Sequence, residues 1–199
     1  MNNLKKSIWF SSPIMMGMWE EHDYHAQKII KEILRLKKTV QSSNRSSVNG
    51  WQSVKNLYEY EFLTPLMNYI TVPICEYLLD LKLSLQDYNL TVSQAWANVN
   101  PPNSYNKSHQ HPQSFISGVY YLQVPKKSGN ICFEDPRNPW CLLQGSYTEL
   151  NEFTASEVNY EPNPGMLILF PSYLSHHVEI NNSKEDRISI SFNVSIVKK

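Results

Sequence analysis

Three histidines are the side chains of this chain best suited to bind a metal. His109 and His111 lie two residues apart in an extended stretch, where alternate side chains point to the same face. His176 follows an apolar run much later in the chain, and a neighbouring strand can bring it to the same place. Neutral imidazole is a common ligand of iron, copper and zinc. The pattern predicts a metal site with one face of protein ligands and an open side.

A polar row along the last predicted strand can hold an anion beside that metal. Arg187 and Ser189 share one face of the strand. A guanidinium binds a carboxylate through two parallel hydrogen bonds, and a hydroxyl can add a third. The apolar residues of the same segment take the other face: Ile188, Ile190 and Phe192. The polar row suits the inside of a barrel and also suits a face in water, so both placements stay open.

A histidine metal site beside an anion-binding arginine is typical of a non-haem iron(II) oxygenase that uses 2-oxoglutarate. Such sites usually hold two histidines and one carboxylate, with the acid two residues after the first histidine. Position 111 is a histidine instead. Two alternatives follow. Either all three histidines bind the metal, or one of the first pair lies outside the ligand set. In the second case the acid is absent or comes from elsewhere, for instance Asp135.

Other residues of reactive type are assigned structural roles. The favoured interpretation of Asp135-Pro-Arg137 is a turn with the arginine paired to an acid, ahead of a carboxylate or substrate contact at the site. His22 and His25 lie on the polar part of a predicted helix. His177 must point away from the face that His176 uses. The tryptophans are expected in the core rather than at a substrate entrance: Trp51, Trp96 and Trp140.

Composition excludes several classes of function. The 199 residues suit one domain, and 41% hydrophobic residues are ample for a core. Lys+Arg and Asp+Glu both number 18, so no net field attracts nucleic acid or a membrane surface. No signal peptide or membrane span is evident. An odd number of cysteines without CxxC spacing predicts free thiols in the cytoplasm: Cys75, Cys132 and Cys141.

The first part of the chain is predicted to be helical after an extended entry. Residues 6–18 suggest a strand broken at Pro13, and residues 20–38 show helical apolar spacing. Residues 41–50 are rich in serine and asparagine and predict a loop. A second helical region covers 62–82, with Pro65 and Pro73 expected near helix starts.

The second part is predicted to be mainly strands separated by glycine and proline clusters. The expected strands are 91–99, 115–124, 130–134, 166–170, 177–180 and 187–197. Helices first and strands afterwards predict an α+β protein that is mainly β, with helices covering a sheet that closes into a barrel or sandwich.

Six segments together resemble a family of 2-oxoglutarate/Fe(II) oxygenases that is frequent in marine bacteria and cyanophages. They are Gly50-Trp-Gln-Ser53, Trp96-Ala-Asn98, His109-Gln-His-Pro with Ser117-Gly-Val-Tyr-Tyr-Leu122, Gly129-Asn-Ile-Cys-Phe-Glu-Asp-Pro-Arg137, Pro171-Ser-Tyr-Leu-Ser-His176, and Arg187-Ile-Ser-Ile-Ser-Phe-Asn193. The resemblance covers nearly the whole chain.

The resemblance implies one domain, residues 1–199, with a double-stranded β-helix core (a jelly roll, cupin-like) at 89–199. Residues 1–88 would supply a strand and helices packed outside. By similarity to the wider prolyl-hydroxylase-like group, His176 would be the distal iron ligand, and Arg187 would bind the far carboxylate of 2-oxoglutarate with help from Tyr121. His109 falls at the first ligand position, and His111 falls where the acid is expected.

The sequence therefore predicts a 2-oxoglutarate-dependent Fe(II) dioxygenase that hydroxylates a small molecule or a protein side chain. The metal ligands would be His109, His111 and His176, and the cosubstrate would contact Arg187, Ser189 and Tyr121. We expect a cytoplasmic protein, bacterial or phage-encoded, with no nucleic-acid or membrane partner. Two alternatives stay open: a three-histidine cupin-like metalloenzyme that needs no 2-oxoglutarate, and a jelly-roll binding module without catalysis. Oligomeric state is not predicted.

Overall fold

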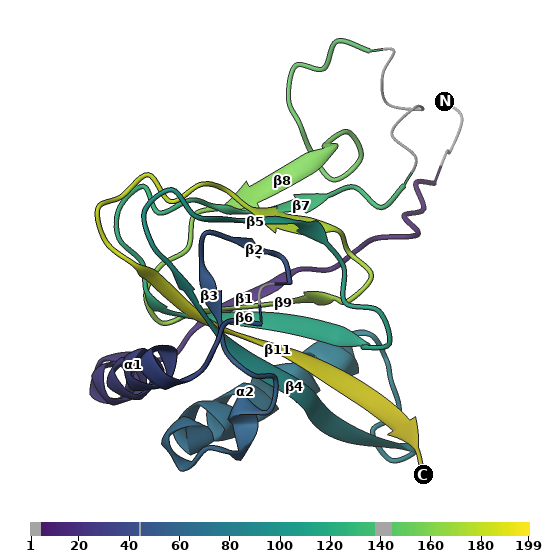
Figure 1. Ribbon diagram of the computed structural model, residues 1–199. Coiled ribbons are helices and arrows are strands. Elements are labelled where there is room, and N and C mark those ends of the chain that lie inside the picture. Colours follow the sequence, from purple (N-terminus) through teal and green to yellow (C-terminus); the bar gives the residue numbers. More distant parts are fainter. Residues whose placement is uncertain (1–4, 44, 138–144) are drawn as a thin grey trace.

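The fold is a sandwich of two antiparallel sheets with helices on one side (Figure 1). The computed structural model describes residues 5–43, 45–137 and 145–199. In spatial order, the large sheet holds β1 (Met15–Met18), β9 (Met166–Pro171), β6 (Ile116–Gln123), β11 (Arg187–Lys198), β4 (Tyr88–Asn100) and β3 (Trp51–Gln52). The small sheet holds β2 (Ser47–Val48), β5 (Tyr105–His109), β10 (His176–Val178), β7 (Ile131–Glu134) and β8 (Glu157–Tyr160). This confirms the predicted jelly roll, α+β and mainly β.

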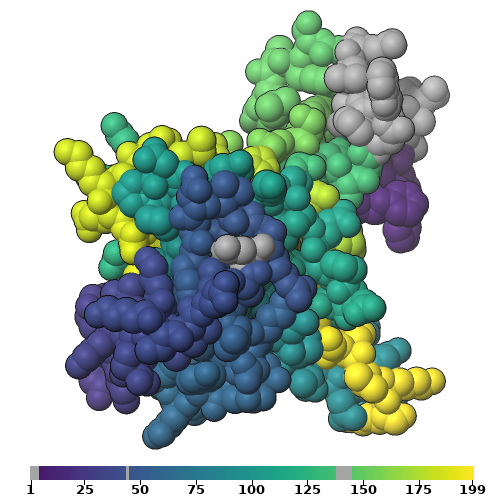
Figure 2. Space-filling model, viewed as in Figure 1, coloured from purple at the N-terminus to yellow at the C-terminus, as the bar shows by residue number. Residues whose placement is uncertain are grey.

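The helices cover the outer face of the large sheet, so the small sheet lies on the side away from them (Figure 1). Helix α1 is His22–Thr39 and α2 is Thr64–Asp80, preceded by the short 3-10 turns η1 (Leu57–Glu59) and η2 (Glu61–Leu63). In the space-filling view the helical part forms the lower left of the surface, and residues 145–156 stand out at the opposite end (Figure 2). No helix of the described chain is long and apolar enough to span a membrane.

Helix α2 departs from the prediction at Pro73. Pro65 lies in the first turn, as expected, but Pro73 lies inside the helix. A proline there removes one backbone hydrogen bond and crowds the preceding turn. The helix continues because Ile70 and Ile74, on either side of the proline, are both buried in the core. Their burial offsets the local cost.

Strand β11 separates two cores, because its side chains alternate between them. Ile188, Ile190 and Phe192 are buried among the helices and the large sheet. The opposite face of the strand carries Arg187 and Ser189 into the space between the sheets. A second apolar cluster fills part of that space: Val119, Tyr121, Ile131, Phe133, Ile168, Phe170 and Leu174.

Several strands were missed or misplaced by the sequence analysis. Only Met15–Met18 of the predicted 6–18 segment is a strand, and the predicted loop at 41–50 contains β2. Strand β8 was not predicted, and β5 was predicted only as the extended stretch that holds His109. Strand β8 lacks the alternation of buried apolar side chains that marks a strand, because three of its four residues are exposed. The short strands β2 and β3 exist because they pair with β5 and β4.

We expect Gly118→Ala to destabilise the protein by about 1–3 kcal/mol, because the core is already filled there. Gly118 lies directly opposite Phe192, and an added Cβ would overlap the phenylalanine ring. Gly17→Ala is the matched control, since its nearest neighbour would be the Tyr69 hydroxyl at 4.0 Å. Urea unfolding of the two variants measures the difference. Equal stabilities would show that the Phe192 ring can move aside.

Candidate active site

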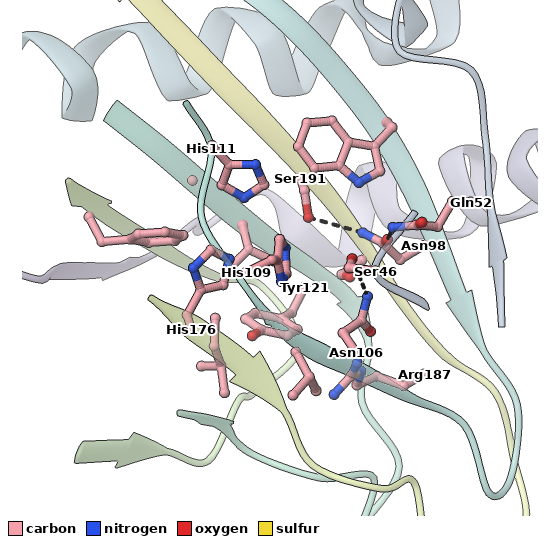
Figure 3. A pocket seen from close by; sticks show the side chains of 17 residues that line it. Ser46, Gln52, Asn98, Asn106, His109, His111, Tyr121, His176, Arg187 and Ser191 are labelled. Carbon is pink, nitrogen blue, oxygen red and sulfur yellow. Dashed lines mark hydrogen bonds between the residues drawn. The ribbon is translucent and has the colours of Figure 1, made fainter. Parts of the chain in front are cut away.

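Side chains from both sheets line one cavity between them (Figure 3). The small sheet and the loop after β5 contribute His109, His111 and His176. The large sheet contributes residues of β11, β6 and β4: Arg187, Ser189, Ser191, Tyr121, Asn98 and Trp96. The cavity therefore brings together the three predicted histidine ligands and the three predicted cosubstrate residues, but not Asp135, the alternative acid.

Strand pairing positions the histidines. His176 in β10 lies directly opposite His109 in β5, and their ring centroids are 4.3 Å apart. His111 lies just beyond the end of β5, with its ring centroid 5.0 Å from that of His109 and 5.1 Å from that of His176. One nitrogen from each of the three rings lies within 4.8 Å of the others. These three side chains can hold a metal ion.

Backbone carbonyls fix the orientation of two of the rings. His109 Nδ1 lies 2.7 Å from the carbonyl oxygen of Lys107, and His176 Nδ1 lies 2.9 Å from that of Leu174. A carbonyl oxygen only accepts, so each Nδ1 carries the proton and donates it. The lone pair of each ring is then on Nε2, the atom left for a metal. Such a bond to the far nitrogen is the usual support of a metal-binding histidine.

Burial keeps these imidazoles neutral. Burial, then repulsion from His109, lowers the pKa of both His111 and His176 to about 3. Burial also lowers the pKa of His109, against the opposing effect of its hydrogen bond to the Lys107 carbonyl. A metal ion needs the neutral form of each ligand. The cluster therefore does not have to lose protons before a metal binds at neutral pH.

The carboxylate alternative finds no support in the position of Asp135. Its carboxylate accepts hydrogen bonds from Arg137 Nε at 2.9 and 3.1 Å and from Arg137 Nη2 at 2.9 Å. That ion pair lowers the pKa of Asp135, first through the side-chain hydrogen bond. Asp135 is not among the residues that line the cavity. Within the described chain, the candidate ligand group at the cavity contains histidines alone.

Arg187 provides a positive charge that has no carboxylate partner in the described part of the chain. Its side chain is 2% exposed, and Nη1 donates only long hydrogen bonds, of 3.4 and 3.3 Å, to the carbonyl oxygens of Ser128 and Gly129. Nε is buried with no hydrogen-bond partner. No carboxylate of the described residues forms an ion pair with it. A buried charge without a partner is costly, so the guanidinium is suited to an anion that enters the cavity.

Tyr121 and Ser189 stand beside this arginine, opposite each other in the pairing of β6 with β11. Burial raises the pKa of Tyr121 to about 12, although the neighbouring Arg187 charge opposes the shift. The phenol therefore keeps its proton and can donate it to an anion. These two hydroxyls and the guanidinium form a polar cradle that could hold a carboxylate.

A network of amides forms another wall of the cavity and was missed by the sequence analysis. Gln52 Nε2 donates to Asn98 Oδ1 at 2.9 Å, and Asn98 Nδ2 donates to Ser191 Oγ at 3.0 Å (Figure 3). Asn106 Nδ2 donates to Ser46 Oγ at 3.2 Å. The alternation of Trp96 and Asn98 along β4 was the available signal. Gln52 and Ser46 could not be placed, because β2 and β3 were not predicted.

The residues assigned structural roles lie mostly away from the cavity. Trp51 Nε1 donates to the Val40 carbonyl at 2.9 Å, whereas Trp96 lines the cavity, with its ring centroid 5.5 Å from that of His111. His22 Nδ1 lies 2.6 Å from the Tyr120 hydroxyl, and His25 stacks on Trp19. Trp140 and Cys141 lie outside the described residues.

Comparisons with known proteins point to one family. The profile of the family described as "Putative 2OG-Fe(II) oxygenase" matches residues 94–193. No curated protein sequence matches the chain. A prolyl-4-hydroxylase from Pseudomonas putida shares the fold with a TM-score of 0.64 at 15% identity, over 92% of this chain and 91% of its own.

Two further structures share the fold. SnoN, a non-haem alpha-ketoglutarate-dependent epimerase from nogalamycin biosynthesis, has a TM-score of 0.67 at 14% identity, over 93% of this chain and 77% of its own. HygX from Streptomyces hygroscopicus, with nickel, 2-oxoglutarate and hygromycin B bound, has a TM-score of 0.64 at 9% identity, over 93% and 83%. At these identities the likeness shows the fold alone.

The metal-free protein should lose stability as the pH falls from 6.5 towards 3. His111 and His176 stay neutral in the folded state but take up a proton on unfolding below pH 6.5, so acid favours the unfolded chain. Each pH unit below 6.5 lowers the free energy of unfolding by at most about 1.4 kcal/mol per histidine. At pH 5 the loss is about 2 kcal/mol for each histidine.

Urea unfolding in EDTA at pH 7 and pH 5 measures this effect. Between pH 7 and pH 5, the free energy of unfolding should fall by up to about 4 kcal/mol less in the double variant His111→Gln, His176→Gln than in the wild type. The same dependence in the variant and the wild type would show that these histidines are not held neutral by the fold.

Proposed function

The chain belongs to the family of 2OG-Fe(II) oxygenases whose profile covers residues 94–193, and we propose that it hydroxylates a C–H bond of its substrate. When bound, iron(II) and 2-oxoglutarate would supply the oxidising chemistry: 2-oxoglutarate would lose CO2 and become succinate with one oxygen atom of O2, and the other oxygen atom would become the substrate hydroxyl. The single observation that carries the site assignment is the convergence of three neutral imidazoles beside a buried arginine that has no carboxylate partner among the described residues.

His109, His111 and His176 would hold the iron. The hydrogen bonds from Nδ1 of His109 and His176 to backbone carbonyls aim both Nε2 atoms into the cavity and resist rotation of the rings. His111 packs between Trp96 and the other two rings. Three ligands on one side leave the other positions for small molecules.

Arg187, Ser189 and Tyr121 would hold the far carboxylate of 2-oxoglutarate. The guanidinium offers its unpaired Nε–H, and the tyrosine keeps its hydroxyl proton because burial raises its pKa. Hydrogen bonds to a charged group in a buried site are worth about 1.5–3 kcal/mol each. One carboxylate of an incoming dicarboxylate would thus pair with the charge of Arg187. The same contact would fix the position of that end of the molecule.

Apolar side chains on the cavity wall would exclude water from the reacting atoms. Four of them line the cavity: Val119, Ile131, Phe170 and Val178. Exclusion of water strengthens the electrostatic interactions in the site and limits side reactions. The opposite wall carries the amide network of Gln52 and Asn98, which can orient a polar group.

The all-histidine ligand set changes the charge of the site. A site with one carboxylate would carry a charge of +1 when Fe(II) binds, whereas three neutral imidazoles leave it at +2. The greater positive charge favours a dianionic cosubstrate and weakens retention of iron in its absence. This supports ordered binding in which 2-oxoglutarate stabilises the metal.

The substrate, the compartment and the biological source belong to the proposal as well. A small molecule or a protein side chain would be hydroxylated, since the relatives by fold include both a prolyl-4-hydroxylase and an enzyme crystallised with hygromycin B. Cys75 and Cys132 are free thiols, which supports the cytoplasm. A marine bacterial or phage source rests on the sequence resemblance alone.

Anaerobic titration with Fe(II) and then 2-oxoglutarate should produce the weak visible absorption band of the iron–2-oxoglutarate chelate. His176→Ala should abolish the band, because it removes a ligand. His177→Ala is the matched control, since that side chain points to the other face of β10, and it should leave the band intact. His111→Asp should retain the band, because it supplies the acid that this position usually holds.

Two other outcomes would each support an alternative. Stoichiometric iron without any response to 2-oxoglutarate would favour a cupin-like metalloenzyme. Failure to bind iron under anaerobic reconstitution, with circular dichroism showing a folded protein, would favour a binding module without catalysis.

Arg187→Lys should weaken 2-oxoglutarate binding by about 10- to 100-fold, because lysine keeps the charge but cannot bind the carboxylate through a planar fork. The Fe(II) affinity without 2-oxoglutarate should not change. Arg35→Lys, on the exposed face of α1, is the control. Titration of the chelate band gives both constants, and an unchanged 2-oxoglutarate constant in Arg187→Lys would remove this residue from the cosubstrate site.

A further inference from the structure

The outer face of the small sheet carries a second group of metal-binding side chains. His176 points into the cavity, so its neighbour His177 points to the opposite face of β10. Cys132 lies directly opposite His177 on β7, and Glu157 lies on the next strand, β8. One ligand atom from each of these three side chains lies within 4.8 Å of the others. Three adjacent strands thus form a rigid platform for the group.

A second carboxylate, that of Glu134, lies close to Glu157 of this group. Glu134 and Glu157 are directly opposite each other in the pairing of β7 with β8, and like charges at such positions repel. The cation that pairs with them in the described chain is His177 when protonated, with its Nδ1 3.8 Å from Glu134 and 3.9 Å from Glu157. Ser108 Oγ donates to Glu134 and holds that side chain in place.

The thiol of Cys132 experiences the same negative field. Its side chain is 1% exposed, and burial, followed by the charges of Glu179 and Glu157, raises its pKa to about 11. A divalent cation at this point would replace the repulsion between thiol and carboxylates with attraction, and metal coordination deprotonates a thiol. Burial and the nearby carboxylates therefore favour the protonated thiol when no metal is bound.

We propose that Cys132, His177 and Glu157 bind a divalent transition metal of the zinc class, with Glu134 adding negative charge beside it. A thiolate, an imidazole and a carboxylate are the ligand types that Zn(II) and Co(II) accept in tetrahedral sites. The ion would fasten the edge strand β8 to β7 and β10. It would be separate from the histidine cavity, on the other side of the same strand.

Co(II) titration under anaerobic conditions, with a phosphine as the reductant, tests the proposal on the full chain. Sulfur ligation to Co(II) gives an intense near-ultraviolet charge-transfer band, which three histidines cannot produce. We expect one such band per chain. His176→Ala and Cys75→Ser should keep it, because neither residue belongs to the group. Cys132→Ser should abolish it.

Glu157→Gln is a second variant that should fold, because this side chain is exposed. It should weaken Co(II) binding, measured by the same band, by at least about tenfold. The proposal is overturned if the wild type shows no band, if the band persists in Cys132→Ser, or if Glu157→Gln binds as tightly as the wild type. The first of these results would mean that the contacts of His177 with two glutamates are the whole arrangement.

Discussion

The antiparallel pairing of β10 with β5 and β7 determines which histidine enters the cavity. His176 faces His109 across one pair of strands, whereas His177 faces Cys132 across the other. Because side chains alternate along a strand, a shift of one residue would exchange the two histidines. The cavity would then lose His176, a candidate metal ligand whose ring is oriented by the Leu174 carbonyl. The chemistry of this sheet is therefore a consequence of strand register.

Burial of the apolar face of β11 is what fixes the register of the large sheet. Ile188, Ile190 and Phe192 are at most 1% exposed, and Phe192 occupies the space that Gly118 leaves open. A slip in β11 would place these side chains between the sheets and the guanidinium of Arg187 among the helices, where a charge costs most. The helical layer thus stabilises the anion cradle without touching it. Its role is to make the orientation of β11 with its apolar side chains towards the helices far more favourable than the reverse orientation.

The sequence predicted the parts of the site that depend on local alternation. The spacing of His109 and His111 and the polar row of Arg187 and Ser189 required only a strand period, and the structure brings these residues to one cavity. The helix predicted at 20–38 was similarly local and is present as α1. The family resemblance supplied Tyr121, which no spacing argument had indicated.

What was missed depends on contacts between distant segments. Strand β8 is exposed and weakly patterned, so its pairing with β7 could not be foreseen, and Glu157 was never considered beside Cys132. His177 was set aside because it points away from the cavity, which is correct but does not exclude a site on the other face. Gln52 entered the cavity through the two-residue strand β3. Pro73 stayed inside a helix because burial outweighed a local preference.

The fold limits the reaction less than the charges in the cavity do. The same fold supports a prolyl-4-hydroxylase and an epimerase among its relatives, so the sheets alone do not choose a reaction. In this chain the cavity contains three neutral imidazoles and one guanidinium, and no carboxylate from the described residues faces them. Such a site has no negative charge of its own with which to retain a divalent cation. Under the proposed function, the cosubstrate would supply that charge, so that metal retention and cosubstrate binding would be one coupled event.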